Sequence, residues 1–240
     1  MDHTSQASAA ALSRPLTGRD ELTLDPGSPW AALDMVARLA PGMDVQALDV
    51  TTADRLVAQL YGQLYGDVCD CRTRCVVCGE AFGFELSLRT LIEMQDRERP
   101  RPDFADGSWS WTDGRRVRAP RIADLTLTPE ALLERLVISG GACDAAVLAF
   151  LERAAPILTL DLAARCPHCG TDQEVRFDLA RYLIQRLAGE RPFLLREVHL
   201  IAARYGWSFA EILDLSRDDR RALAGLIAAE PALASRRAAS

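Results

Sequence analysis

The apolar residues of this chain recur at helical intervals over much of its length. Leu56, Leu60 and Leu64 are spaced four residues apart, so they fall on one face of a predicted helix that begins near Thr51 and ends at Gly66. Further helices are predicted over residues 28–40, 128–138 and 143–155, and almost continuously from residue 180 onward. The chain is therefore expected to be mostly helical.

Two other stretches alternate polar and apolar residues, as half-buried strands do. The first reads VCDCRTRC, turns at CVVCG and returns as FGFELSL; the second reads ILTLDLAARC, turns at CPHCG and returns as QEVRFDL. Each is predicted to be a β-hairpin with a Cys-x-x-Cys pair at its tip. Because the two share the order of strand, CxxCG turn and strand, we interpret them as an internal duplication in which the two hairpins pack together.

A third hairpin is predicted over residues 108–121, where Asp113 and Gly114 would form a type I′ turn. Trp109 and Trp111 share one face of its first strand. They could stack on nucleic-acid bases beside the neighbouring arginines or anchor a protein partner. The interpretation we favour is a hairpin with one buried aromatic face.

The cysteine content narrows the chemistry of the two CxxCG turns. Seven cysteines occur without a recognisable secretory signal, which points to a reducing cytoplasm, where CxxC pairs are more often metal ligands than disulfides. Zinc prefers four tetrahedral sulfur or nitrogen ligands, and the two turns supply four thiols: Cys75, Cys78, Cys166 and Cys169. Since 87 residues separate the pairs, one zinc ion would staple the two halves together. Four protein ligands leave no open position, so this zinc would be structural.

Two other interpretations of the cysteines remain open. Cys69 and Cys71 could join the first turn in a local site, leaving the second pair to His168 or another partner. Alternatively, the thiols could be redox-active, as in a CxxC thiol oxidoreductase. A thioredoxin-like CxxC opens a helix, however, and here each pair leads into a strand. Cys143 is expected to be a small core or capping residue.

Charge and motifs exclude several functions. The net charge is −6, and the C-terminal segment RDDRRALAGLIAAE balances three arginines with three acids, so we expect a solvated helix face and not a DNA-reading helix. A zinc-ribbon nucleic-acid-binding regulator is nevertheless the main alternative function. No apolar run approaches the roughly 18 residues of a membrane helix. No Gly-rich phosphate loop, GxSxG, HExxH or paired catalytic carboxylates occur, so the chain is not expected to be an enzyme.

These patterns predict an α+β fold that is mostly helical, with two zinc-knuckle hairpins and a C-terminal helical hairpin. The expected organisation is a mobile leader, a zinc-stapled body, a C-terminal helical segment and a tail. Their predicted ranges are 1–18, 19–190 (with hairpins at 67–90 and 157–180), 191–230 and 231–240.

Several segments share their order with a known family. They are a helix ending LYGQLYGDV, the CVVCG turn, CPHCGTDQEVRFDL, and the ending LLREVHLIAARYGWSFAEILDLSRDDRRALAGLI. Over about residues 20–230 the chain resembles the baseplate hub assembly family of T4-type tailed phages, whose relatives occur in prophage and extracellular contractile injection loci. The most distinctive match is Tyr205-Gly206-Trp207 and the helices after it. The first turn departs from the pattern, because it lacks the usual proline and two more cysteines precede it.

The resemblance implies a non-enzymatic role. The chain would assist assembly of the central hub of a contractile-tail baseplate, or sit in it, with hub or spike proteins as partners. It would be cytoplasmic or incorporated in a phage-like particle. The matching cysteines would hold the structural zinc. We expect the partner-facing surface to include Trp207, Tyr205, Leu213, Trp109 and Trp111.

Overall fold

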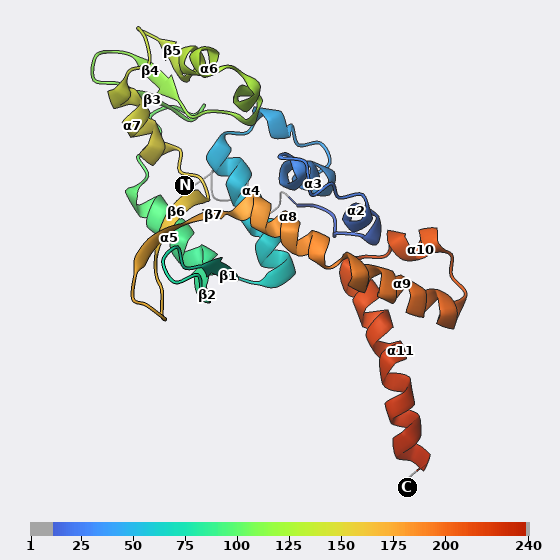
Figure 1. The fold of residues 1–240 in the computed structure, drawn as a ribbon. Helices are drawn as coiled ribbons and strands as arrows, with labels where there is room; N and C mark the ends of the chain where they lie inside the picture. Colours follow the sequence, from blue (N-terminus) through green and yellow to red (C-terminus); the bar gives the residue numbers. More distant parts are fainter. Residues whose placement is uncertain (1–11, 239–240) are drawn as a thin grey trace. The chain divides into compact units, whose positions relative to one another are not determined.

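The computed structural model describes residues 12–238, with side chains placed for residues 12–229 (Figure 1). Residues 1–11 of the predicted leader and the last two of the predicted tail lie outside the described residues. The chain forms two compact units, residues 43–180 and residues 1–42 with 181–240. These boundaries differ from the expected ones, because the segment before residue 43 groups with the C-terminal helices.

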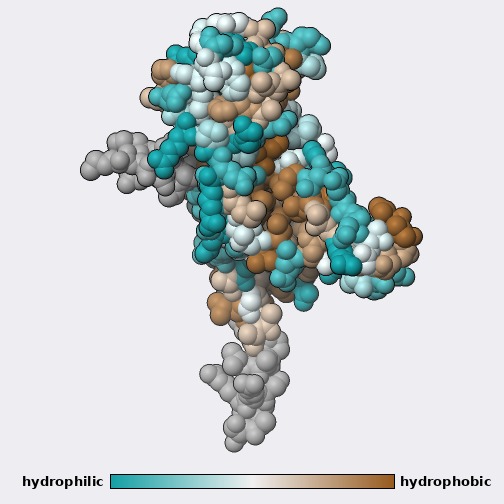
Figure 2. Space-filling model, turned by 90° about the vertical axis from the view of Figure 1, so that its left-hand side faces the viewer, coloured by the Kyte–Doolittle hydropathy of each residue, from teal (hydrophilic) through white to brown (hydrophobic). Residues whose placement is uncertain are grey.

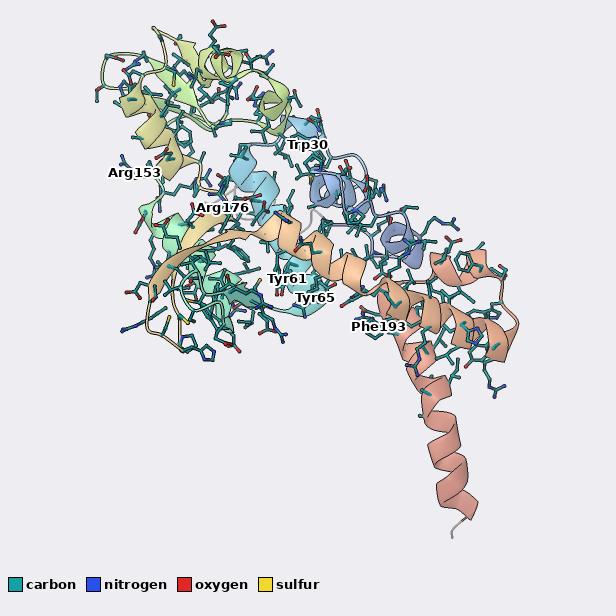
Figure 3. All side chains as sticks on the ribbon, viewed as in Figure 1. Trp30, Tyr61, Tyr65, Arg153, Arg176 and Phe193 are labelled. Atoms are coloured by element: carbon teal, nitrogen blue, oxygen red, sulfur yellow. The ribbon has the colours of Figure 1, made fainter. Side chains whose placement is uncertain are left out.

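The unit of residues 43–180 contains the two cysteine hairpins and a small third sheet. Helix α4 is followed by a β-hairpin, and the second strand of that hairpin continues directly into α5. Tyr61 Oη on α4 donates a hydrogen bond to the carbonyl oxygen of Val68 in the hairpin at 2.9 Å. The rings of Tyr61 and Tyr65 lie next to each other, with centroids 5.3 Å apart (Figure 3). The elements are η1 Val45–Ala47, α4 Val50–Tyr65, β1 Val68–Arg74, β2 Ala81–Ser87 and α5 Leu88–Glu98.

The second hairpin repeats the dimensions of the first. Strands β6 Thr159–Arg165 and β7 Asp172–Asp178 pair antiparallel, as β1 and β2 do, and α8 Leu179–Gly189 follows directly. Each element begins and ends 91 residues after its counterpart among β1, β2 and α5. Figure 1 shows the two hairpins side by side, which the distances between their turns require.

The third sheet lies between the hairpins in sequence and has the order β3-β4-β5. Its strand β5 falls where a helix was predicted to reach residue 138. That prediction was wrong, because the helix stops at Leu136 and the β-branched Val137 pairs with Val117 of β4. The elements are β3 Ser108–Ser110, β4 Arg116–Arg118, η2 Ile122–Thr126, α6 Pro129–Leu136, β5 Val137–Ser139 and α7 Ala145–Ala154.

The loop between β3 and β4 is not the predicted type I′ turn. Such a turn needs positive φ at both central residues, and among the described residues only glycines have positive φ. Gly114 has a φ of 87°, whereas Asp113 holds the chain through its side chain, whose Oδ1 accepts a hydrogen bond from the backbone N–H of Arg115 at 3.1 Å. The loop is longer than two residues, so Asp113 need not adopt the strained conformation.

The other unit is helical. Its core joins α9 and α10, and partly buried residues of α11 pack against it; the buried members are Leu194, Val198, Ile201, Ile212 and Leu213. Helix α11 continues past α9 and α10 in Figure 1. No helix within residues 12–238 is both long and apolar enough to cross a bilayer. The elements are α2 Gly18–Leu22, α3 Ala31–Leu39, α8 from residue 181, α9 Arg191–Tyr205, α10 Phe209–Asp214 and α11 Arg217–Ala238.

Residues just before α2 are packed, although the sequence placed them in a mobile leader. Leu16 is buried, its carbonyl oxygen accepts a hydrogen bond from the N–H of Arg217 at 2.8 Å, and Thr17 caps α2. The leader prediction is therefore wrong for residues 13–18. The apolar Leu16 and the N-cap Thr17 are the sequence signals for this segment.

The start of α11 is only in part the solvated face that its mixed charges predicted. Arg217 and Arg220 are buried, with 4% and 1% of their surfaces exposed. Arg217 pairs with Glu21 and Glu190, and Arg220 pairs with Glu21 and, at 2.7 Å, with Glu197. Asp218 and Asp219 are exposed, so only the arginines of this segment enter the buried ion-pair network, which joins α2, α9 and α11.

Candidate metal centre

The first hairpin presents two cysteines from a tight six-residue turn. Cys75 donates its backbone N–H to the carbonyl oxygen of Glu80 at 2.9 Å, and the N–H of Gly79 donates to the carbonyl oxygen of Cys75 at 3.0 Å. Gly79 has a φ of 74°, a left-handed conformation that glycine adopts at no steric cost. The turn therefore depends on the glycine that follows Cys78.

The second hairpin builds the same turn. Cys166 donates its N–H to Thr171 and accepts from the N–H of Gly170, both at 2.9 Å, and Gly170 has a φ of 75°. The residue type that permits the turn is thus the same in both hairpins, and the second turn presents Cys166 and Cys169.

The two turns bring their four sulfur atoms together. All four Sγ atoms lie within 4.8 Å of one another. The Cys75–Cys169 distance is 3.5 Å and the Cys78–Cys166 distance is 3.8 Å. A tetrahedron with metal–sulfur bonds of about 2.3 Å has edges of about 3.8 Å, so the donor set and its spacing fit a four-coordinate metal.

The thiols differ in their readiness to ionise. Hydrogen bonds from the side chain and backbone of Thr171 lower the pKa of Cys169 to about 6. The backbone N–H groups of Cys78 and Val77 lower the pKa of Cys75. The backbone N–H of Glu80 acts in the same direction on Cys78, but desolvation and the other three thiols raise the pKa of Cys78 to about 12. Close thiolates repel one another, so full ionisation of the cluster calls for a cation.

An arginine stands immediately before the first cysteine of each turn. Arg74 Nη1 donates to the carbonyl oxygen of Gly79 at 3.2 Å, and Arg165 Nε donates to that of Gly170 at 3.1 Å. Both side chains thus brace their turns through the glycine that follows the second cysteine. Neither arginine was among the predicted site residues, although their equivalent positions in the two hairpins are visible in the sequence.

The local site formed with Cys69 and Cys71 is not present. Both residues are buried on β1, opposite Leu86 and Phe84, and within the described residues the four turn cysteines form the only metal-competent group of three or more ligands. Strand side chains project to the sides of a hairpin, whereas the turn cysteines lie at its tip. His168 is exposed in the second turn and is not a member of the group.

The two tryptophans of the third sheet pack inward. Trp109 is buried and Trp111 half-buried, and both rings meet Phe150 of α7 edge-on, with centroids 5.6 and 5.2 Å away. Trp109 Nε1 also donates to the carbonyl oxygen of Pro100 at 3.3 Å. The buried aromatic face is therefore confirmed, and Trp109 does not lie on a partner-facing surface.

The predicted partner-facing residues near the C-terminus are likewise partly exposed and partly buried. Tyr205 and Trp207 are each 41% exposed, and their rings lie 5.5 Å apart. Leu213 is buried in the helical core, so it does not belong to that surface. Phe209, which the sequence analysis passed over, is 50% exposed. Figure 2 shows how apolar patches alternate with polar regions on one face of the molecule.

Comparison with models of known protein families, with curated proteins and with solved structures found no match. The resemblance drawn from the sequence motifs thus gains no support from these comparisons.

Proposed function

We propose that this chain is a non-enzymatic assembly or structural protein of the baseplate hub of a phage-like contractile tail or injection system. One structural zinc ion would hold it together. The observation that carries the proposal is the cluster of four cysteines, drawn from two hairpins with 87 residues between Cys78 and Cys166. The assignment to a contractile tail or injection system comes from the resemblance in the order of sequence motifs.

The cluster supports a structural metal because its ligand set is complete. Four thiolates fill the tetrahedral positions of zinc, and none is left for a catalytic water. Bound zinc would supply a cross-link and the charge that lets all four thiols ionise. Cys75 and Cys166 are buried, while Cys78 and Cys169 are exposed, so the metal would sit near the surface of the hairpin pair.

An internal duplication accounts for the paired hairpins. The constant offset of 91 residues covers the two strands, the turn and the helix that follows. The two hairpins also share individual hydrogen bonds. The glycine of each turn and the arginine before each first cysteine make the same contacts in both copies. We infer that one strand–turn–strand–helix segment was copied, and that the metal joins the copies.

The partner surface would be formed by Tyr205, Trp207 and Phe209. Gly206 ends α9 in a left-handed conformation, with a φ of 71°, and Ser208 caps the next helix. This short connection holds three aromatic side chains with 41% to 50% of their surfaces exposed. Exposed aromatic residues are favoured anchors of protein interfaces, so a hub or spike protein is the expected occupant.

The metal part is tested by mass spectrometry of purified wild type, Cys166→Ser and Cys143→Ser. We expect one zinc per chain in wild type and in Cys143→Ser, because Cys143 is outside the cluster. Cys166→Ser should hold well below one zinc. Wild-type protein without metal would contradict the structural zinc.

The assembly part is tested by co-purification with proteins encoded beside the gene. We expect a tail-hub or spike protein to bind, and Trp207→Ala to weaken binding at least about tenfold, as expected for an aromatic anchor. Leu226→Ala is the matched control, since Leu226 is 63% exposed but lies on α11. A folded Trp207→Ala protein that binds as well as wild type would exclude this surface.

A thiol oxidoreductase is the second candidate, and one observation favours it. Cys169 is exposed, its pKa is lowered to about 6, and its Sγ lies 3.5 Å from that of Cys75. A low thiol pKa and an adjacent resolving thiol are what disulfide exchange requires. Zinc-free protein that reduces a disulfide substrate, and loses this activity in Cys169→Ser, would favour that function.

A further inference from the structure

The contacts between the two hairpins follow a twofold pattern. With the offset of 91 residues, Cys75 corresponds to Cys166 and Cys78 to Cys169. The Cys75–Cys169 contact at 3.5 Å therefore corresponds to the Cys166–Cys78 contact at 3.8 Å. Such reciprocal contacts are those of two copies related by a twofold axis. A pair with this symmetry could equally form between two identical hairpins of different molecules.

One contact breaks the symmetry. Gln173 of β7 reaches the first turn with both ends of its amide: its Oε1 accepts the N–H of Val76 at 3.0 Å, and its Nε2 donates to the carbonyl oxygen of Arg74 at 3.2 Å. These two backbone groups stand on either side of Cys75. Gln173 thus holds the backbone around one cysteine of the first hairpin from a strand of the second.

The reverse contact cannot form. The residue equivalent to Gln173 in the first hairpin is Phe82, which has no hydrogen-bonding side chain and is buried against Cys75 and Cys166. The residue equivalent to Val76 in the second hairpin is Pro167, which has no N–H to donate. Donor and acceptor are therefore both missing on the other side, and the contact distinguishes the two hairpins.

We propose that Gln173 is a positioning residue of the four-cysteine site. It fixes the backbone that carries Cys75, and it selects pairing of the two different hairpins of one chain over pairing of identical hairpins from two chains. This inference rests on the proposed zinc site, because its effect is exerted on metal retention.

The selection follows from hydrogen-bond satisfaction. Two first hairpins would place Phe82 against the N–H of Val76, and two second hairpins would place Gln173 against Pro167. In each case a hydrogen bond that the pairing of the two different hairpins makes would be lost, because donor and acceptor no longer meet. Discrimination against wrong partners by unpaired polar groups is a general source of specificity.

The test compares wild type with Gln173→Leu, Gln173→Glu and Glu174→Leu, each loaded with zinc and mixed with a chromogenic chelator. Gln173→Leu removes both hydrogen bonds, Gln173→Glu keeps the acceptor for Val76, and Glu174 is an exposed neighbour on the same strand. We expect zinc release to be about 10- to 100-fold faster in Gln173→Leu, as for other residues that orient metal ligands. It should be intermediate in Gln173→Glu and unchanged in Glu174→Leu.

Two further readouts separate positioning from loss of folding. The thiolate-to-metal absorption of cobalt-loaded protein should change in Gln173→Leu but not in Glu174→Leu. After metal-free refolding and zinc addition, light scattering should detect more zinc-bridged dimer in Gln173→Leu than in wild type. An unchanged release rate overturns the positioning role, and an unchanged dimer fraction overturns the pairing role. Wild-type protein that binds no zinc would instead overturn the proposed function together with this inference.

Discussion

The Sγ atom of Cys78 lies 3.8 Å from the Sγ atom of Cys166, although 87 residues lie between them in the sequence. Bringing two such distant positions together costs chain entropy, which grows slowly with the length of the closed loop. A metal held by both turns would offset that cost, since metal binding to a site absent from the unfolded chain stabilises the fold.

Removal of metal is therefore expected to loosen the two hairpins selectively. We expect amide hydrogen exchange in β1, β2, β6 and β7 to rise at least about tenfold after chelation, because local opening then lacks the cross-link. Exchange in α9, which belongs to the other unit, should change little. Equal increases in both units would contradict a local role for the metal.

Gly18 is predicted to tolerate no side chain. A Cβ atom there would lie 2.8 Å from Arg220 Nη1 and 2.9 Å from Leu213 Cδ2. Gly18→Ala should destabilise the protein by about 1–3 kcal/mol, as overpacking does. The control is Gly62→Ala within α4, where nothing lies within 4 Å and alanine should stabilise by about 0.5–1 kcal/mol. Urea unfolding of both variants checks the opposite signs.

The buried ion pairs at the start of α11 give a third prediction. Arg220→Met removes one of the two arginines that pair with buried Glu21, and it leaves half-buried Glu197 with only Arg221, at 3.6 Å. Breaking a buried pair from one side costs about 3–5 kcal/mol. Arg19→Ala removes an exposed pair with Asp214 and should cost less than about 1 kcal/mol. Similar losses in the two variants, measured by thermal or urea unfolding, would mean that the network is not buried in solution.

Asp20 is expected to make the protein sensitive to acid. Burial opposes its ionisation, but hydrogen bonds from Arg14 and Thr17 outweigh burial and lower the pKa of Asp20 below its ordinary value. A depressed folded-state pKa stabilises the protein above the unfolded value of about 4, and this stability is lost as the pH falls through the folded value. Asp20→Asn should therefore be less stable than wild type at pH 7, with a difference that shrinks in acid. A constant difference would argue against this linkage.

Asp54 should affect the pH dependence of stability in the direction opposite to Asp20. Burial raises the pKa of Asp54, and nearby Asp178 adds to the effect, although the N–H of Leu158 donates to Asp54 Oδ2 at 2.6 Å. A raised folded-state pKa favours the folded protein at low pH, and this contribution is lost as the pH rises through the folded value. Asp54→Asn keeps an oxygen for Leu158, so it should match or exceed wild-type stability at pH 7 and vary less with pH. Unfolding at several pH values from 4 to 7 checks this, and a large loss of stability at pH 7 would contradict it.

The local sequence pattern was sufficient to predict the two hairpins. It did not predict where α6 ends or that the arginines of α11 are buried. The alternating residues around each CxxCG predicted both hairpins, because strand period and turn glycine are local properties. The end of α6 was missed because pairing with Val117 draws Val137 into a strand, and that partner lies 20 residues away. The arginines of α11 were misjudged because their partners, Glu21, Glu190 and Glu197, are not neighbours in the sequence.

The sequence by itself determined which four thiols could form a metal site, because each CxxCG turn presents its two thiols through local geometry alone. Only the tertiary structure decided that the four thiols converge and that Cys69 and Cys71 stay apart from them. It also decided that Gln173 bridges the two hairpins and that Leu213 and Trp109 are buried. The physical reason is that turn geometry depends on neighbours along the chain, whereas convergence and burial depend on contacts between residues that are distant in sequence.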